Sequence, residues 1–580
     1  MIKRLAGCVR QYKKDTVLAP VYISAEVVME VLIPLLMASL IDDGINQGNM
    51  GVIWRLGALL VLLAGISLLF GVLAGNASAR AMSGFACNLR HDMYYKVQEY
   101  SFRNIDRIST SSIVTRLTTD VNNIQNAFMM IIRIAVRAPI MIILSLIMAL
   151  SINVRLALVF LFVIPFLGGG LFLIVRLVHP IFERVFKTYD RLNRIVQENL
   201  RGIRVVKSFV REEHEKEKFA TISQHIYKDF TKAEKILAFN SPMMQLSMYT
   251  CILFISWFGA RLIVHGDLTT GQLMSIFTYS MQILMSLMMM SMVFVMITIS
   301  RASAERVTEV LNEKPDLSNC ENPVYQVGNG AVTFEGVDFS YSADPGKLCL
   351  KGIDLDIKAG ETVGIIGGTG SSKTSLVQLI PRLYDVTAGT VKVGGIDVRN
   401  YDITALRNEV AMVLQKNVLF SGTIKENLRW GNEEATDEEL IRVCKLAQAD
   451  DFIQSFPEGD DTYMEQGGTN VSGGQKQRLC IARALLKKPK ILILDDSTSA
   501  VDTKTDALIR RAFREEIPDT TKFIIAQRIS SISDADTIII MEGGSINAVG
   551  THEQLLKENE IYQQVYYSQQ KGGDDNGTEA

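Results

Sequence analysis

The sequence predicts two parts: an all-α membrane domain with six helical spans, then an α/β domain that holds a phosphate-binding loop. Residues before about 300 contain long apolar runs, and after about 330 short strand-like and helix-like segments alternate. The stretch "GGTGSSKTS", residues 367–375, nearly matches the phosphate-loop pattern G-x-x-x-x-G-K-[ST]. At 580 residues the chain is long enough for more than one domain.

Composition excludes several classes of protein. The net charge is -2, and basic residues form no stripe, so no nucleic-acid partner is expected. Seven scattered cysteines lack any CxxC pair and are interpreted as reduced packing thiols rather than a disulfide framework. The six histidines show no metal-ligand spacing.

Six segments are long and apolar enough to cross a bilayer, which takes about 20 residues of helix. They are residues 18–41, 52–75, 134–150, 156–178, 243–263 and 274–299. The basic, amphipathic start, residues 1–15, predicts an interfacial helix. The apolar run after it is too long for a signal-peptide core and has no small-residue cleavage site, so we expect it to stay as a span.

The connections after the second and fourth spans are long and rich in Lys and Arg, whereas the others are short and nearly free of them. The positive-inside rule therefore places the long connections, both termini and the α/β part in the cytosol, with the spans in the cell membrane. A helix over 76–102 would project about 40 Å beyond the bilayer. Such a stalk suits a lever that contacts another domain, although an ordinary cytosolic loop is the alternative.

Ionisable residues occur within the spans. Glu26 and Glu30 lie one turn apart in the first span, as do Arg133 and Arg137 at the start of the third. Charged groups at membrane depth face a cavity or a partner, unless these helices extend past the bilayer. The sixth span also carries methionines that could line an adaptable pocket or simply pack against lipid and helices. They are Met274, Met281, Met285, Met288, Met289, Met290, Met292 and Met296.

The α/β part places the phosphate loop between a strand and a helix. Alternation over 332–341 predicts an edge strand, "ETVGIIGG" (361–368) a strand entering the loop, and "SLVQLIPRL" (375–383) the helix after it. Backbone N–H groups then face a phosphate, Lys373 adds positive charge, and Thr374 offers a hydroxyl to Mg²⁺. Ser372 stands where the pattern requires its second glycine.

Three further motifs support nucleotide chemistry. "KILILDDSTSAVD" (490–502) predicts a buried strand that ends at Asp495, suited to Mg²⁺. "NVSGGQKQRLCIARALL" (470–486) predicts Ser472 as a helix N-cap, with Gly473 and Gly474 allowing close approach of a γ-phosphate. Gln415 lies at another strand end.

Together these motifs resemble the ATP-binding cassette (ABC) transporters of the exporter type, along essentially the whole chain. The resemblance implies the ABC exporter fold, which is an all-α transmembrane six-helix domain plus an α/β P-loop ATPase domain. It also implies that the chain works as a dimer, with ATP bound between the P-loop of one chain and the signature of the other. It implies ATP and Mg²⁺ as cofactors. The residues that it assigns to nucleotide binding are Tyr341 (adenine), Gly367, Gly368, Thr369, Gly370, Ser371, Ser372, Lys373, Thr374, Ser375, Gln415, and the signature Ser472, Gly473, Gly474 and Gln475.

The same resemblance assigns Thr374, Gln415 and Asp495 to the metal, 499–502 to the D-loop, and 102–120 and 199–213 to the coupling loops. The expected domains are an elbow helix (1–15), a transmembrane domain (16–305), a linker (306–330), the nucleotide-binding domain (331–570) and a disordered tail (571–580).

The departures from the family pattern gather at the chemistry. Asp496 stands where the family has its general base, Glu, and Gln527 where it has the switch His. Asp is about 1.5 Å shorter in reach than Glu, and Gln cannot carry a positive charge, so both changes weaken the positioning and electrostatics of phosphoryl transfer. If position 372 needs a positive φ, Ser372 costs about 1–2 kcal/mol and weakens ATP binding without abolishing it.

The sequence therefore predicts the degenerate-site subunit of a heterodimeric exporter of amphipathic drugs or similar hydrophobic compounds. Its partner would be a homologous half-transporter with intact Glu and His. Two alternatives stay open, a functional homodimer and an exporter or flippase of a defined lipid or peptide. A membrane nucleotide sensor that does not pump is disfavoured by the intact signature and coupling loops.

Overall fold

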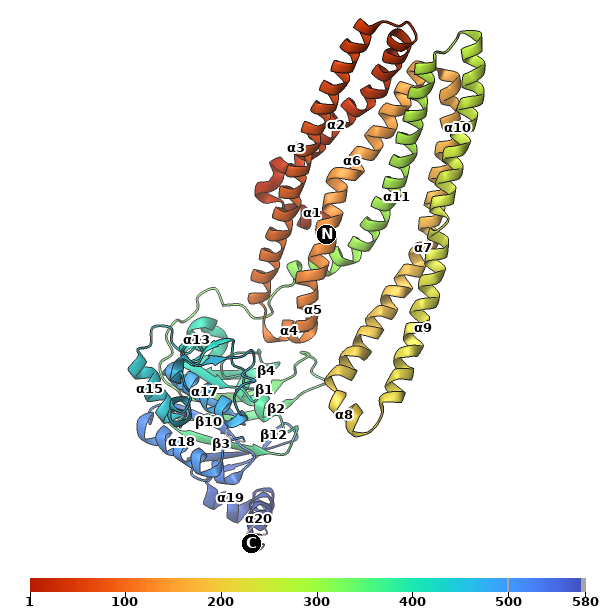
Figure 1. Cartoon of the computed structure of the whole chain (residues 1–580). Coiled ribbons are helices and arrows are strands. Elements are labelled where there is room, and N and C mark those ends of the chain that lie inside the picture. Colours follow the sequence, from red (N-terminus) through yellow and green to blue (C-terminus); the bar gives the residue numbers. More distant parts are fainter. Residues whose placement is uncertain (498–499, 575–580) are drawn as a thin grey trace. The chain divides into compact units, whose positions relative to one another are not determined.

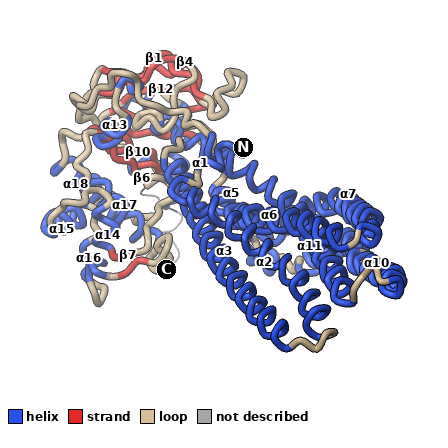
Figure 2. Tube along the Cα trace, turned by 90° about the horizontal axis from the view of Figure 1, so that it is seen from above, coloured by secondary structure: helices blue, strands red, loops and turns tan. Residues whose placement is uncertain are grey.

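The computed structural model describes residues 1–497 and 500–574 and divides into two compact units, which Figures 1 and 2 show. The first unit contains Met1–Glu99 and Ser109–Glu313, and the second contains Tyr100–Ile108 and the chain from Lys314 onward. In Figure 2 the strands all lie in the second unit. The chain therefore passes between the units three times, and the short segment 100–108 belongs to the strand-containing unit.

The first unit is helical throughout its described elements. They are α1 (Ile2–Gly7), α2 (Lys13–Ser39), α3 (Met50–Gln98), α5 (Thr110–Thr115), α6 (Val121–Ile152), α7 (Val154–Arg201), α8 (Ile203–Ser208), α9 (Glu212–Leu237), α10 (Asn240–His265) and α11 (Thr270–Asn312), with short 3₁₀ or π turns at Arg10–Tyr12, Leu40–Ile45 and Arg116–Asp120. Six helical stretches among the described residues are long and apolar enough to cross a membrane, which confirms the predicted number of spans.

Local signals explain where the long helices begin. Asn49 caps α3 by accepting hydrogen bonds from the backbone N–H groups of Gly51 and Val52. Thr269 begins α11 with a reciprocal capping box to Gln272. α3 has no internal proline and continues unbroken to Gln98, so the predicted cytosolic stalk is one helix with the second span.

Buried side chains of α2, α6, α7, α10 and α11 form the main apolar core of the first unit. Polar contacts fix the helices to one another. Tyr279 of α11 is fully buried and donates its hydroxyl to the carbonyl of Val31 in α2 at 2.8 Å. Near the end of α11, Arg306 forms an ion pair with Asp120, whose side chain is buried.

The described residues of the second unit form three sheets. The strands are β1 (Val332–Phe339), β2 (Leu350–Ile357), β3 (Thr362–Gly367), β4 (Ala388–Val393), β5 (Ile396–Asp397), β6 (Val410–Val413), β7 (Gly422–Thr423), β8 (Tyr463–Met464), β9 (Ile491–Asp495), β10 (Thr521–Ile525), β11 (Thr537–Glu542) and β12 (Ser545–Gly550). The largest sheet has the order β12-β11-β3-β10-β9-β6, with β12 antiparallel and the other neighbours parallel. A second sheet has the order β2-β1-β4-β5, and β7 pairs with β8.

The helices of this unit surround the sheets. They are α4 (Phe102–Ile108), α12 (Lys373–Gln378), α13 (Ile403–Glu409), α14 (Ile424–Arg429), α15 (Asp437–Leu446), α16 (Asp450–Gln454), α17 (Gly473–Leu486), α18 (Thr503–Glu516), α19 (His552–Glu558) and α20 (Glu560–Asp574). The predicted coupling loops contain α4 and α8. Residues 575–580 of the predicted tail lie outside the described residues.

Two details of the sequence prediction are wrong. β1 is not an edge strand, because it pairs with β2 on one side and β4 on the other. Its alternation reflects one buried and one exposed face, which an internal antiparallel strand also has. The helix after the phosphate loop ends at Gln378 rather than at residue 383, because Pro381 follows and Arg382 takes a positive φ of 51°.

Candidate nucleotide site

The candidate site lies at the carboxyl ends of neighbouring parallel strands. β3 leads into the phosphate loop, β9 ends at Asp495, and Gln527 follows β10. Register aligns Ile365, Asp495 and Ile525 across the three strands, so the residues that come next meet at one edge of the sheet. Together with Gln415, which follows β6, they line a cavity of about 600 Å³.

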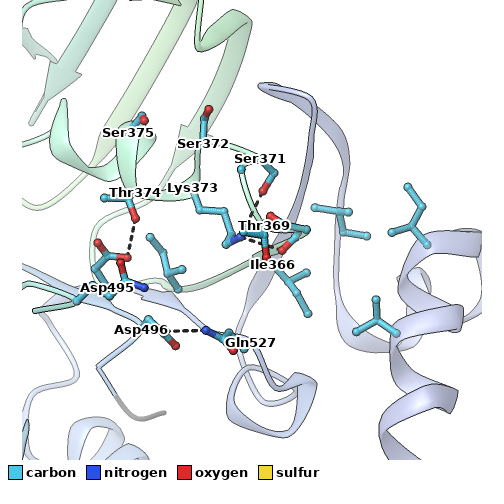
Figure 3. A pocket seen from close by; sticks show the side chains of 18 of the residues that line it. Ile366, Thr369, Ser371, Ser372, Lys373, Thr374, Ser375, Asp495, Asp496 and Gln527 are labelled. Carbon is cyan, nitrogen blue, oxygen red and sulfur yellow. Dashed lines mark hydrogen bonds between the residues drawn. The ribbon is translucent and has the colours of Figure 1, made fainter. Parts of the chain in front are cut away.

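The phosphate loop is folded around its own lysine. The Lys373 ammonium donates to the carbonyls of Gly367 (2.8 Å) and Gly368 (2.9 Å) and to Oγ of Ser371 (3.3 Å). Figure 3 shows Lys373 reaching toward Ser371. Burial lowers the Lys373 pKa from its ordinary value, and the charges of Asp496 and Asp495 oppose that shift. Neutral carbonyls only partly satisfy this cation, so the loop is suited to receive phosphate oxygens.

Two positions of the loop have special backbone demands. At Gly367 a Cβ would lie 2.2 Å from the carbonyl oxygen of Met541, so a side chain is excluded there. Ser372 has φ 68° and ψ 26°, the left-handed conformation that glycine adopts without strain. The condition set by the sequence prediction therefore holds, because this position does require a positive φ.

Thr374 and Asp495 form a set of oxygen atoms suited to Mg²⁺. The Thr374 hydroxyl donates to Oδ1 of Asp495 at 3.0 Å, and the Asp495 residue is only 2% exposed. Burial raises the pKa of the Asp495 carboxyl above its ordinary value. A buried carboxylate beside a hydroxyl is the hard-oxygen environment that Mg²⁺ prefers, and the exposed Gln415 on the same cavity adds an amide oxygen.

Asp496 and Gln527, the residues predicted to replace the family's general base and switch histidine, contact each other. Nε2 of Gln527 donates to Oδ2 of Asp496 at 2.8 Å (Figure 3). Asp496 has a positive φ of 51°, and its carbonyl accepts from Nε2 of the buried Gln477 at 3.1 Å. Gln477 was not identified from the sequence, although it lies within the same motif as the signature, two residues after Gln475.

The predicted adenine residue Tyr341 lies beside the phosphate loop. Its hydroxyl is 2.8 Å from Oγ of Ser375, and its ring packs edge-on against Tyr384, with centroids 5.1 Å apart. Tyr384 in turn donates its hydroxyl to Asp106 of α4 at 2.8 Å. Burial, together with this contact, raises the pKa of Tyr384 well above its ordinary value. No pattern in the sequence indicates the Tyr384–Asp106 contact, because the two residues lie 278 positions apart.

The signature residues do not line this cavity. Ser472 caps α17 with a reciprocal capping box to Gln475, as its N-cap prediction required. A Cβ on Gly474 would lie 2.8 Å from the carbonyl oxygen of Ala500, so that glycine permits close backbone approach. Ser499 of the predicted D-loop lies outside the described residues.

Comparison with known proteins identifies both parts of the chain. Residues 18–301 match the family model of the ABC transporter transmembrane region, and residues 350–499 match that of the ABC transporter. The chain is 36% identical to the ABC transporter ATP-binding protein YfiB of Bacillus subtilis, over 95% of this chain and 96% of that protein. It is 35% identical to the ABC transporter ATP-binding protein Rv1273c of Mycobacterium tuberculosis, over 97% of each.

Two further matches are to a solved structure and to a relative with a named substrate. The fold matches a bacterial Atm1-family ABC exporter solved with ATP bound, with a TM-score of 0.84 and 24% identity over 96% of this chain and 99% of that one. A fatty acid ABC transporter ATP-binding/permease protein of Mycobacterium bovis is 33% identical over 82% of this chain and 75% of that protein. With its membrane helices and ATPase domain fused in one polypeptide, the chain belongs to the ABC transporter family and has the fold of an ABC exporter.

Proposed function

We propose that this ATP-driven membrane transporter is the degenerate-site subunit of a heterodimeric exporter that expels amphipathic drugs or related hydrophobic compounds across the bacterial inner membrane. The observation that carries the proposal is the contact between Asp496 and Gln527. A general base must reach the attacking water, and a carboxylate that is one methylene short and bound to an amide is poorly placed to do so.

The chain's own P-loop binds Mg-ATP in this proposal, with Thr374, Gln415 and Asp495 around the metal. Mg²⁺ would neutralise charge on the phosphates, while Lys373 and the loop N–H groups orient them. Hydrolysis takes place mainly at the other site, where the signature Ser472–Gln475 faces the partner's P-loop. The partner is a homologous half-transporter with the Glu and His that this chain lacks, and both termini lie in the cytosol.

Charge and side-chain softness favour cationic, amphipathic cargo. Arg137 of α6 binds Glu26 of α2 at 2.6 Å and Glu30 at 2.5 Å, so two carboxyl groups share one guanidinium. Exposed methionines lie along α11, including Met274 and Met292. Flexible thioethers adapt to apolar shapes, and a carboxylate attracts a cation.

The proposed heterodimer is tested with the tagged full-length chain in lipid nanodiscs. One preparation contains this chain alone, and the other is the assembly that the tagged chain captures from native membranes. Alone, this chain should release phosphate at little above background, whereas the assembly captured from native membranes should contain a second, homologous chain and hydrolyse ATP steadily. Rapid phosphate release by the single-chain preparation would support a homodimer and contradict the proposal.

A lipid-like acid is the second candidate cargo, favoured by the relative named as a fatty acid transporter. Stimulation of the assembly's ATPase separates the two. A cationic amphiphilic dye should raise the rate and a long-chain fatty acid should not; the reverse result would favour the lipid.

A further inference from the structure

The C-terminal helix α20 is docked onto the nucleotide cavity. Tyr562, near its start, is 1% exposed and its hydroxyl lies 2.7 Å from Nδ1 of His552. Ile561, Tyr562 and Val565 line the same cavity as the phosphate loop. Figure 3 draws the P-loop, Asp496 and Gln527 within this cavity. The helix is thus part of the ATPase unit's structure rather than a loose extension.

Gln569 lies two turns beyond Tyr562 on α20 and holds the loop that follows β10. Its Nε2 donates to the carbonyl of Gln527 at 2.9 Å, and its Oε1 accepts from the backbone N–H of Ile529 at 2.9 Å. One side-chain amide therefore pairs with a carbonyl and an N–H two residues apart, as a neighbouring β-strand would. The two bonds fix the backbone on both sides of Arg528.

The same loop carries Gln527, whose side chain contacts the carboxylate at the general-base position. Gln527 donates to Asp496 through Nε2 while its own carbonyl is held by Gln569. A continuous chain of hydrogen bonds thus joins α20, the loop backbone and the carboxylate at the general-base position. Because Gln569 contacts only backbone groups of this loop in these bonds, its effect does not depend on which side chain occupies position 527.

We propose that Gln569 is a positioning residue of the nucleotide site, and that α20 sets the conformation of the loop that carries residue 527. Docking of α20 keeps that loop against Asp496, and loss of the Gln569 contacts releases it. This inference depends on the ATPase fold of the chain but not on how slowly the present site hydrolyses ATP.

Hydrogen exchange of the full-length chain in lipid nanodiscs tests the contact directly. Gln569→Leu removes both bonds, so the Ile529 amide should exchange about fivefold faster, the effect of losing one ordinary hydrogen bond. Gln570→Leu is the matched control, because Gln570 donates to the Tyr566 hydroxyl within α20 at 2.8 Å. Equal exchange at Ile529 in the two variants would overturn the proposal.

A second readout separates positioning from simple support of the fold. In an Asp496→Glu/Gln527→His background with measurable ATPase, Gln569→Leu should lower kcat about tenfold while KM for ATP changes less than twofold. Gln569→Glu keeps the acceptor for Ile529 but loses the donor to residue 527, so its kcat should be intermediate. An unchanged kcat for Gln569→Leu would contradict the proposal. If the background itself stays inactive, the weak-site account fails while the exchange comparison still decides the role of Gln569.

Discussion

The side-chain amide of Gln527 donates a 2.8 Å hydrogen bond to Oδ2 of Asp496. Asp496 and Gln527, which the sequence analysis predicts to replace the family's general base and switch histidine, thus bond to each other while both line the nucleotide cavity. Because the Gln527 amide donates and the Asp496 carboxylate accepts, the two residues are best understood together.

Restoring both family residues should therefore restore hydrolysis. Asp496→Glu/Gln527→His lengthens the base and supplies a cationic donor, so steady-state phosphate release by the single-chain preparation should rise about 10–100-fold. Asp496→Asn/Gln527→His has the histidine without a base and should stay near background. Equal activity of the two double variants would show that residue 496 has no role as a base.

Ser372→Gly should stabilise the ATPase unit. Ser372 has φ 68° in the folded chain, so its strain belongs to the folded state. Removing a cost of about 1–2 kcal/mol, less the entropy of a new glycine, leaves a gain of about 0.5–1 kcal/mol. Scanning calorimetry should show a higher Tm.

The matched control is Ser342→Gly, at an exposed serine without a positive φ. That change should lower Tm slightly, because glycine there adds chain entropy and removes the 3.1 Å contact between the Ser342 and Ser340 hydroxyls. If the strain is equal before and after binding, the ATP affinity of Ser372→Gly should change less than twofold, and Ser372 would then not weaken ATP binding as the sequence predicts. A large gain in affinity with no change in Tm would place the strain in the bound state instead.

The pH dependence of stability should report Asp495. Burial raises its pKa above the ordinary 3.8, so its contribution to stability is complete below that value and is lost as pH rises through the raised pKa. Asp495→Asn removes the penalty of the ionised form, so at neutral pH without Mg-ATP its Tm should exceed that of the native chain. The difference should vanish in acid.

Asp502 serves as a control, because its pKa is shifted in the opposite direction to that of Asp495. Its pKa is lowered, first by a backbone hydrogen bond to Thr505, so the ionised form is the stabilising one. Asp502→Asn should not raise Tm at neutral pH.

Asp495→Asn should also abolish the Mg²⁺-dependent part of the ATP-induced Tm shift, and retention of that shift would exclude Asp495 as a metal ligand.

Arg137 should be essential in the membrane domain. Arg137→Ala leaves Glu26 and Glu30 without their shared cation, which should lower the domain's Tm by about 5 °C or more. Arg133→Ala, one turn earlier on the same helix and exposed, should change Tm little. Adding Glu26→Gln and Glu30→Gln to Arg137→Ala should recover most of the loss; no recovery would mean that packing, not charge, explains the effect.

Local and motif-based features were predictable from the sequence. Six apolar runs of spanning length, the strand–loop–helix around Lys373 and the capping role of Ser472 each arise from neighbouring residues, and the structure has them. Alternation in β1 could not distinguish an internal from an edge strand, because both have one buried face. The contacts of Gln569 with Ile529 and of Tyr384 with Asp106 join residues that are distant in sequence. Hydrophobic periodicity and short motifs describe neighbouring residues, so they cannot predict such contacts.

Helix α4 belongs to the same compact unit as the ATPase sheets, although the chain reaches it between two helices of the other unit. A soluble fragment that starts at Lys314 would lack Asp106, the acceptor of the Tyr384 hydroxyl, and Ser101, which hydrogen-bonds to Asp316. Studies of nucleotide binding on such a fragment would therefore describe a domain with part of its own surface missing. Supplying residues 100–108 as a peptide, or fusing them ahead of residue 314, should give a more faithful isolated domain.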